Sequence, residues 1–224
     1  MMNAKERIAR RVAQELHDGD VANLGIGLPT LVANFLADGI LVTLQSENGF
    51  LGLGPLEEVN ANLVNAGGQP CGILPGAAIF DSCYSFSLIR GGHVDVCVLG
   101  GLQVDEQGNL ANWMVPGKRV PGMGGAMDLV VGAKRVIIAM EHCAKNGEPK
   151  LLHRCHYPLT AAGKVSKVIT EYAVFSFVNG EMVLDEISDL ITLDELRACT
   201  EARFRLSENL KLAPAAEVTC AIPL

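Results

Sequence analysis

The sequence predicts an α/β fold: one open, mostly parallel β-sheet with helices on both faces, to which antiparallel hairpins are added. Three observations favour this class. Short apolar segments rich in β-forming residues alternate with helical patterns, as in β-α-β units. Hydrophobic residues make up 49% of the 224 residues, which is enough for a sizeable core. Glycine contributes 24 residues and indicates many tight loops.

The N-terminal part of the chain predicts a helix followed by one β-α-β unit. Apolar residues Ile8, Val12 and Leu16 recur at helical spacing. Two strands with a helix between them come next, and such a crossover joins parallel strands. The predicted elements are a helix over residues 4–16, a strand over 21–24, a glycine loop over 25–29, a helix through Phe35 and a strand over 41–44.

The remainder of the chain predicts further strands, helices and hairpins. Residues 72–77 contain Pro-Gly and indicate a loop, and a long glycine-rich loop spans residues 115–126. The other predicted elements are a helix over 82–90, a strand over 94–99, a hairpin of 102–104 with 110–113, strands over 135–140 and 150–155, a hairpin of 173–178 with 181–184, and a helix from a capping box at Thr192 and Glu195 toward Arg203. No linker or repeat divides the chain, so we predict a single domain over residues 1–224, with residues from about 205 to 224 as a weakly ordered tail.

Charge and cysteine content exclude several classes of function. The chain has 25 acidic and 18 basic residues, a net charge of −7, and no basic run longer than a pair such as Arg10 and Arg11, so we predict no nucleic-acid binding. Seven cysteines, an odd number spread over apolar segments, indicate reduced thiols. The N-terminus lacks an apolar signal core, and no stretch is apolar enough for a membrane span. We therefore expect a cytoplasmic protein without a membrane anchor.

Glu47 is the strongest catalytic candidate. It follows the apolar, β-rich segment 40–44, and ligands meet α/β sheets at such strand ends. Asn48 and Gly49 accept left-handed backbone conformations and would hold the carboxylate on a sharp turn. The next segment, residues 50–55, is apolar, which suits a dry pocket. On this pattern alone a second interpretation stays open, in which Asn48 and Gly49 form only a hairpin turn and Glu47 is solvated.

Two other segments could complete such a pocket. Gly25 and Gly27 lie between a strand and a helix, where N–H groups can meet an anion, but the third glycine of a dinucleotide motif is missing and a structural turn is the simpler interpretation. Asn23 is polar within an apolar strand, so in a buried position it needs a hydrogen-bond partner and could face the same pocket as Glu47. The loop 122–126 offers bare amides suited to an oxyanion hole, or is a flexible surface loop.

Metal and serine-hydrolase chemistry find little support. Histidines and cysteines gather around His142 and around His153 and His156, but neither group has the HExxH or paired CxxC spacing of zinc sites, so we predict no metal. Ser46 is not part of a G-x-S-x-G elbow, and this argues against an α/β-hydrolase.

Several motifs, in order along the chain, resemble the β subunit of class I CoA-transferases, enzymes that move coenzyme A (CoA) between carboxylic acids. The most specific motif is Ser-Glu-Asn-Gly at residues 46–49. The resemblance runs from about residue 4 to about residue 204 and is closest to the acetate (acetoacetyl-CoA) type. The segments that carry it are residues 45–49, 51–55, 65–67, 74–77, 89–95, 110–113, 116–118 and 122–128.

The resemblance implies a CoA-transferase fold and a ping-pong reaction in which Glu47 is the nucleophile. Its carboxylate would form an acyl anhydride and then a γ-glutamyl-CoA thioester. The family's oxyanion amides map to Gly125 and Ala126, and its pocket asparagine maps to Asn23. CoA is then a substrate, and no resident cofactor is expected. The positions expected to contact CoA are Gly25, Gly27, Asn48, Gly49, Gly76, Gly100 and Gly124.

The resemblance also implies a partner. In two-subunit members a related α subunit supplies much of the CoA-binding surface, so we expect an α2β2 heterotetramer that acts on acyl-CoA and short-chain carboxylic acids. Within the class, a 3-oxoadipate or other 3-oxoacid succinyl-CoA transferase is the alternative. Two other classes are an acyl-CoA hydrolase that uses the same intermediate, and a CoA-binding scaffold that needs no nucleophile at Glu47.

Overall fold

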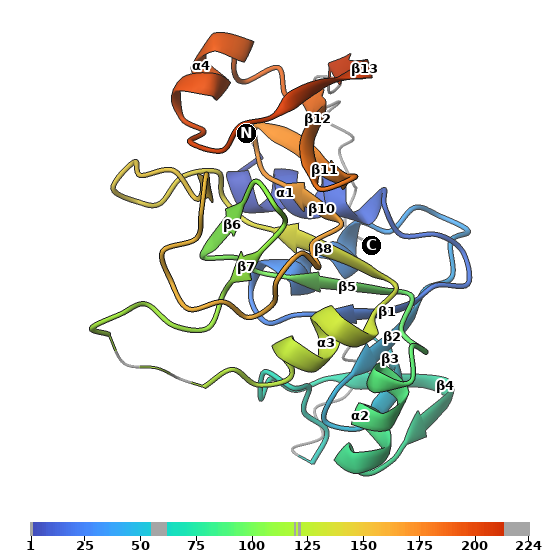
Figure 1. Ribbon diagram of the computed structural model, residues 1–224. Helices are drawn as coiled ribbons and strands as arrows, with labels where there is room; N and C mark the ends of the chain where they lie inside the picture. Colours follow the sequence, from blue (N-terminus) through green and yellow to red (C-terminus); the bar gives the residue numbers. More distant parts are fainter. Residues whose placement is uncertain (1, 55–61, 119, 121, 213–224) are drawn as a thin grey trace.

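The structure is a computed structural model that describes residues 2–54, 62–118, 120 and 122–212. Within these residues a ten-stranded sheet crosses the molecule, and a three-stranded sheet lies beside it (Figure 1). The order across the large sheet is β13 (Arg205–Leu212), β12 (Glu181–Ile187), β11 (Ala173–Val178), β10 (Lys167–Ile169), β8 (Arg135–Ala139), β5 (Val96–Leu99), β1 (Val21–Leu24), β2 (Thr43–Ser46), β3 (Phe50–Gly54) and β4 (Gly72–Ile79). The small sheet contains β7 (Leu110–Ala111), β6 (Gln103–Asp105) and β9 (Leu151–Leu152).

The centre of the large sheet is parallel, and its ends are mainly antiparallel. Strands β10, β8, β5, β1 and β2 run in one direction. Strands β3 and β4 continue the sheet as antiparallel neighbours on one side, and β11 and β12 do so on the other. The predicted open, mostly parallel sheet with added hairpins is therefore confirmed. Each β-α-β crossover delivers the next strand end to the same edge of the sheet.

Helices cover both faces of the sheet, as predicted. In Figure 1, α1 lies behind the strands and α3 lies in front of them. The helices are α1 (Ala4–Ala13), the 3-10 helix η1 (Leu28–Phe35), α2 (Ser82–Arg90), α3 (Ala126–Gly132) and α4 (Leu193–Ala198). The capping box predicted for α4 is present, because Thr192 and Glu195 bond to each other's backbone N–H groups. Among the residues described, none of the helices combines the length and apolar character that a bilayer span requires.

Alternation along the central strands divides the core between the two faces. On β5, Val96 and Val98 pack with α1 and η1, whereas Cys97 and Leu99 pack with residues of α2 and α3 on the opposite face. All four of these side chains are buried. The parallel centre is therefore covered on both sides, which accounts for the continuous apolar sequence of this strand.

The largest differences from the sequence prediction are at residues 72–77 and 205–212; in addition, β10 was not predicted, β9 is shorter than the predicted strand 150–155, and α4 ends at Ala198. Residues 72–77, expected as a loop, belong to β4, an edge strand that accommodates Pro75 because one side of its backbone has no strand partner among the described residues. The ladder skips from the pair Leu51–Ala78 to the pair Leu53–Ile73, so residues 74–77 bulge opposite Gly52. Residues 205–212, expected as a weakly ordered tail, form β13 parallel to β12, and residues 213–224 lie outside the described residues.

Candidate active site

Glu47 occupies the tight turn that joins β2 to β3. The N–H of Gly49 donates to the carbonyl oxygen of Ser46 at 3.0 Å, and the N–H of Phe80 donates to the carbonyl oxygen of Gly49 at 2.9 Å. Gly49 has φ +125°, and a Cβ atom there would lie 2.0 Å from the Phe80 carbonyl oxygen, so the turn requires glycine. The hairpin interpretation is thus correct for the backbone. The Glu47 side chain is nevertheless half-buried and not free in solvent.

Asn23 and Glu47 meet at this turn. Asn23 lies on β1 opposite Gln45 of β2 and is only 1% exposed. Its Nδ2 donates to the Glu47 carboxylate Oε2 at 3.2 Å, to Gln45 Oε1 at 2.7 Å and to the Gln45 carbonyl oxygen at 3.3 Å. These acceptors determine which way the amide points. The opposite atom, Asn23 Oδ1, is buried and has no hydrogen-bond partner among the described residues.

A second layer of hydrogen bonds, which was not predicted from the sequence, supports Asn23. Gln45 is 2% exposed, and its Nε2 donates to Ser85 Oγ of α2 at 2.9 Å. The Ser85 hydroxyl donates a hydrogen bond to the carbonyl oxygen of Ser46 at 3.4 Å. Four polar side chains therefore connect α2 to the turn in the order Ser85, Gln45, Asn23 and Glu47. The available signal was a polar residue within an apolar strand, the same signal that identified Asn23.

The glycine-rich loop before α3 reaches the same carboxylate. A Cβ atom built on Gly125 would lie 3.3 Å from Glu47 Cγ and 3.4 Å from Glu47 Oε1, so the Glu47 side chain occupies the space next to Gly125. Ala126 begins α3, and its N–H has a long 3.4 Å contact with the carbonyl oxygen of Met123. Gly124 has φ +57° with open space around it. One expected oxyanion position, Gly125, therefore lies beside Glu47, and the other, Ala126, follows it as the first residue of α3.

Most of the positions expected to contact CoA do not line the cavity beside Glu47. Gly25 lines the cavity beside Glu47, but its N–H already donates to the carbonyl oxygen of Val98 at 2.8 Å, so this amide is not available to a phosphate. Asn48 is also engaged, since its Nδ2 donates to the Val64 carbonyl oxygen at 2.7 Å. Gly27 is an exposed helix cap with φ +88°. Of the seven positions, only Gly25 is among the described residues that line the cavity; Gly27, Asn48, Gly49, Gly76, Gly100 and Gly124 are not.

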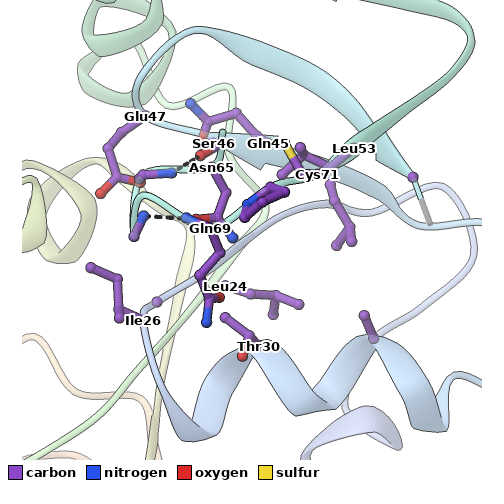
Figure 2. A pocket seen from close by; sticks show the side chains of 17 residues that line it. Leu24, Ile26, Thr30, Gln45, Ser46, Glu47, Leu53, Asn65, Gln69 and Cys71 are labelled. Carbon is purple, nitrogen blue, oxygen red and sulfur yellow. Dashed lines mark hydrogen bonds between the residues drawn. The ribbon is translucent and has the colours of Figure 1, made fainter. Parts of the chain in front are cut away.

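A cavity of about 230 Å³ opens beside Glu47 between β1, η1 and the β2–β3 hairpin (Figure 2). Its wall is mostly apolar, and among the described residues that line it Glu47 is the only Asp, Glu, Lys, Arg or His. Other polar groups in the wall are uncharged hydroxyls and amides. The lining residues are Leu24, Gly25, Ile26, Thr30, Ala33, Leu44, Gln45, Ser46, Glu47, Leu53, Gly54, Asn65, Ala66, Gly67, Gln69, Pro70 and Cys71.

The histidines singled out in the sequence lie elsewhere. His142 is fully buried, and its two ring nitrogens contact Thr170 Oγ1 at 3.0 Å and Thr200 Oγ1 at 2.9 Å. Burial lowers the pKa of His142 to about 4. His153 pairs with Glu106 at 2.7 Å at the surface. Neither histidine contributes to the Glu47 site, and within the described ranges no three His, Cys, Asp or Glu side chains are grouped to hold a metal.

A sequence model of the coenzyme A transferase family matches residues 5–198. The chain belongs to the coenzyme A transferase family. The beta subunit of acetate CoA-transferase from Escherichia coli (strain K12) is 68% identical over 93% of this chain and 97% of the relative. A probable succinyl-CoA:3-ketoacid coenzyme A transferase subunit from Bacillus subtilis (strain 168) is 53% identical over 94% of this chain and 99% of the relative. A solved structure, the acyl-CoA transferase YdiF apoenzyme from Escherichia coli O157:H7, has a TM-score of 0.78 at 24% identity and covers 95% of this chain and 43% of that chain, which shows the shared fold.

Proposed function

We propose that the chain is the β subunit of a short-chain acyl-CoA:carboxylate CoA-transferase of the acetate/acetoacetate type, with Glu47 as the nucleophile. One observation carries the proposal. The Glu47 carboxylate is held on a tight turn, accepts a hydrogen bond from Asn23 at 3.2 Å and lies beside Gly125. A carboxylate fixed in this way, beside a cavity whose described lining residues include no other Asp, Glu, Lys, Arg or His, is suited to attack a thioester.

The reaction proceeds through two covalent intermediates. A Glu47 carboxylate oxygen attacks the thioester carbonyl carbon, the C–S bond breaks, and CoA leaves as a thiolate. The product is a mixed anhydride between Glu47 and the acyl group. The thiolate then attacks the Glu47 side-chain carbon, which releases the first acid as a carboxylate and leaves γ-glutamyl-CoA. A second carboxylate reverses these steps, so the kinetics are ping-pong.

Fixed donors near Glu47 lower the barriers of these steps. Each tetrahedral intermediate carries an oxyanion, and one well-placed donor is worth roughly 10²- to 10³-fold in rate. The amides of Gly125 and Ala126 are assigned this role, because Gly125 lies beside the carboxylate and Ala126 follows it at the start of α3. Asn23 holds the carboxylate in position. The apolar cavity wall keeps water away from the anhydride and from the glutamyl thioester, because water would hydrolyse both intermediates.

A second subunit completes the proposed enzyme. The relatives from Escherichia coli and Bacillus subtilis are each named as one subunit of their enzyme, the former as the beta subunit, which supports an α partner and an α2β2 assembly. CoA enters as a substrate, and the chain needs no resident cofactor. The Bacillus subtilis relative supports a second candidate, transfer from succinyl-CoA to a 3-oxoacid. The free cysteines fit a reducing compartment, so we place the reaction in the cytoplasm.

The test is the intact mass of this chain, co-expressed with an α subunit and incubated with acetoacetyl-CoA. A CoA-sized adduct that maps to Glu47 and reacts with borohydride supports the proposal. Glu47→Ala should lose the adduct and all transfer, and Glu47→Asp should lose about 100-fold or more, because its carboxylate is displaced by roughly 1 Å. Glu148→Ala, an exposed glutamate in a remote turn, is the control. Acceptor-independent release of CoA would indicate a hydrolase, and a folded complex without adduct or turnover would refute the proposal.

A further inference from the structure

Helix α2 contacts both halves of the proposed active site. It lies beside α3, which begins at the oxyanion positions (Figure 1), and its residue Ser85 bonds to β2, the strand that leads into the Glu47 turn. Ser85 and Ile89, four residues apart, are fully buried, and Phe86 and Arg90 form a second row beside them. Neighbouring residues of one helix are therefore placed to contact different parts of the site.

Ser85 holds the two residues that precede Glu47. Its Oγ accepts from Gln45 Nε2 at 2.9 Å and donates to the carbonyl oxygen of Ser46 at 3.4 Å. Gln45 in turn accepts from Asn23 Nδ2 at 2.7 Å, and the same nitrogen donates to the Glu47 carboxylate. One hydroxyl of α2 therefore bonds both to the backbone that leads into the turn and to the side chains that orient the carboxylate.

Phe86, the next residue of α2, lies at the oxyanion loop. A Cβ atom built on Gly125 would be 3.3 Å from Phe86 Cζ and 3.3 Å from Glu47 Cγ. The end of the Phe86 ring and the Glu47 side chain therefore border the same small space beside Gly125. The ring is partly buried and packs against the core cluster that contains Leu129 of α3. It keeps Gly125 from settling closer to α2.

Two further contacts join α2 to α3. The Arg90 Nε donates to Asp128 Oδ1 at 2.7 Å, in the first turn of α3. At the other end of α3, a Cβ atom on Gly132 would lie only 2.1 Å from the Ile89 carbonyl oxygen, so the two helices approach closely there. The Arg90 side chain is 64% exposed, and an ion pair in that position contributes little. The packed contacts, Phe86 among them, therefore determine where α3 begins.

We propose that α2 sets the spacing between the nucleophile and its oxyanion donors, with Ser85 and Phe86 as positioning residues. Ser85 determines where the Glu47 turn lies, and Phe86 determines where the oxyanion loop lies. This inference rests on the proposed CoA transfer and adds two residues to it. Neither Ser85 nor Phe86 is among the described residues that line the cavity, so both act through the residues that they contact. Their replacement should therefore lower kcat and leave KM nearly unchanged.

The spacing test replaces Phe86 by leucine in the complex with the α subunit. Leucine stays apolar but lacks the end of the ring, so Gly125 can settle toward α2. We expect kcat for transfer from acetoacetyl-CoA to acetate to fall roughly 10- to 100-fold, since a misplacement of about 1 Å costs on the order of 100-fold. The rate at which the Glu47 adduct forms in a single turnover should fall by the same factor, and KM for acetoacetyl-CoA should not.

Two controls separate positioning from a general loss of stability. Phe177 of β11 is also partly buried against a glycine, since a Cβ atom on Gly108 would lie 3.3 Å from Phe177 Cδ1, and several strands separate it from β2. Phe177→Leu should therefore keep kcat. The second control combines Phe86→Leu with Gly125→Ala. Removal of the ring end makes room for the added Cβ, so the double variant should lose less kcat than the product of the two single losses.

The turn test replaces Ser85 by alanine. We expect kcat to fall about fivefold, the rate equivalent of one buried hydrogen bond, at an unchanged KM. Ser87→Ala is the matched control on the same helix, because Ser87 is exposed and its Oγ donates to the carbonyl oxygen of Cys83 at 2.8 Å, within α2. This variant should keep kcat.

The outcomes distinguish this inference from the function on which it rests. A Glu47 adduct in the unaltered complex, with kcat within twofold in both Phe86→Leu and Ser85→Ala, would overturn the positioning roles and keep CoA transfer. Equal losses in Phe177→Leu and Ser87→Ala, or losses that simply multiply in the double variant, would overturn them too. If Phe86→Leu does not assemble, Phe86→Met is measured against the same thresholds. A folded, unaltered complex without adduct or acceptor-dependent turnover would instead remove the proposed function itself.

Discussion

Gln45 holds the Asn23 side chain in place, so its replacement by leucine tests whether that orientation matters at Glu47. In the structure Gln45 Oε1 accepts from Asn23 Nδ2 at 2.7 Å, the shortest of the three contacts of that nitrogen. Gln45 Nε2 donates to Ser85 Oγ at 2.9 Å. Leucine has nearly the same shape and removes both of these side-chain bonds, which leaves the Asn23 amide held only by the two longer contacts, to Glu47 Oε2 and to the carbonyl oxygen of residue 45.

The expected losses of stability and of kcat follow from these two bonds. Each buried hydrogen bond contributes a net 0.5–1.5 kcal/mol, so Gln45→Leu should lower the free energy of unfolding by about 1–3 kcal/mol. If the same energy must be spent to restore the Asn23 orientation in the transition state, kcat falls roughly 10- to 100-fold, at about 1.4 kcal/mol for each factor of ten. KM for the acyl-CoA should change little, because Gln45 provides only a small part of the cavity wall.

The assay is steady-state transfer from acetoacetyl-CoA to acetate by the αβ complex, together with thermal unfolding. Gln103→Leu is the matched control. Gln103 is also a buried glutamine, 8% exposed, and its Oε1 accepts from the N–H groups of His156 and Tyr157 at 2.9 and 3.0 Å, far from Glu47. It should lose stability and keep kcat. The reasoning is refuted if Gln45→Leu keeps kcat within twofold, or if Gln103→Leu loses as much activity.

Three further substitutions test other contacts. Gly125→Ala should lower kcat about tenfold, because the added Cβ would lie 3.3 Å from Glu47 Cγ and displace the carboxylate. The thermal midpoint should not change, since φ −81° at this position suits alanine. Full activity of the variant would contradict the placement of Gly125 beside Glu47. Gly132→Ala should lower the midpoint by roughly 2–12 °C, since its Cβ would lie 2.1 Å from the Ile89 carbonyl oxygen; a wild-type melting curve would disprove this. His142→Gln should remove part of the acid sensitivity. Burial lowers the pKa of His142 from 6.5 to about 4, so between these pH values the unfolded chain binds a proton that the folded chain does not. The free energy of unfolding should therefore fall by about 3 kcal/mol as the pH falls from 6.5 to 4. Urea unfolding at both pH values should show this loss only with histidine present.

Local signals were sufficient for much of the fold. The residues 82–90 were predicted as a helix, and Asp81 caps α2 at that position by accepting from the Tyr84 N–H. The Asn179-Gly180 pair predicted the β11–β12 hairpin, and both residues have positive φ there. In contrast, Pro75 and Gly76 indicated a loop, because a sequence does not reveal that its strand lies at the edge of a sheet, where a proline is tolerated.

The site was only partly accessible from the sequence, for a similar reason. Glu47 and Asn23 stand out as polar residues in or next to apolar strands. The family resemblance carried by the motif at residues 46–49 assigned both residues to one site. The contact of Gln45 with Ser85 joins residues 40 positions apart on a strand and a helix, and neither residue predicts the other. The cavity wall likewise comes from η1, the β2–β3 hairpin and the loop before β4, so its size depends on packing between segments far apart in the sequence.

The edge position of β4 has a practical consequence for handling the chain. No described strand pairs with its outer side, and Ile73, Leu74 and Ile79 are 39%, 43% and 60% exposed. An uncovered edge with large apolar side chains is a template for pairing with another copy. Purified alone at high concentration, the chain should form soluble aggregates that grow with time, and Ile79→Lys should suppress them. Light scattering of the isolated chain would therefore report on this edge before any activity is measured.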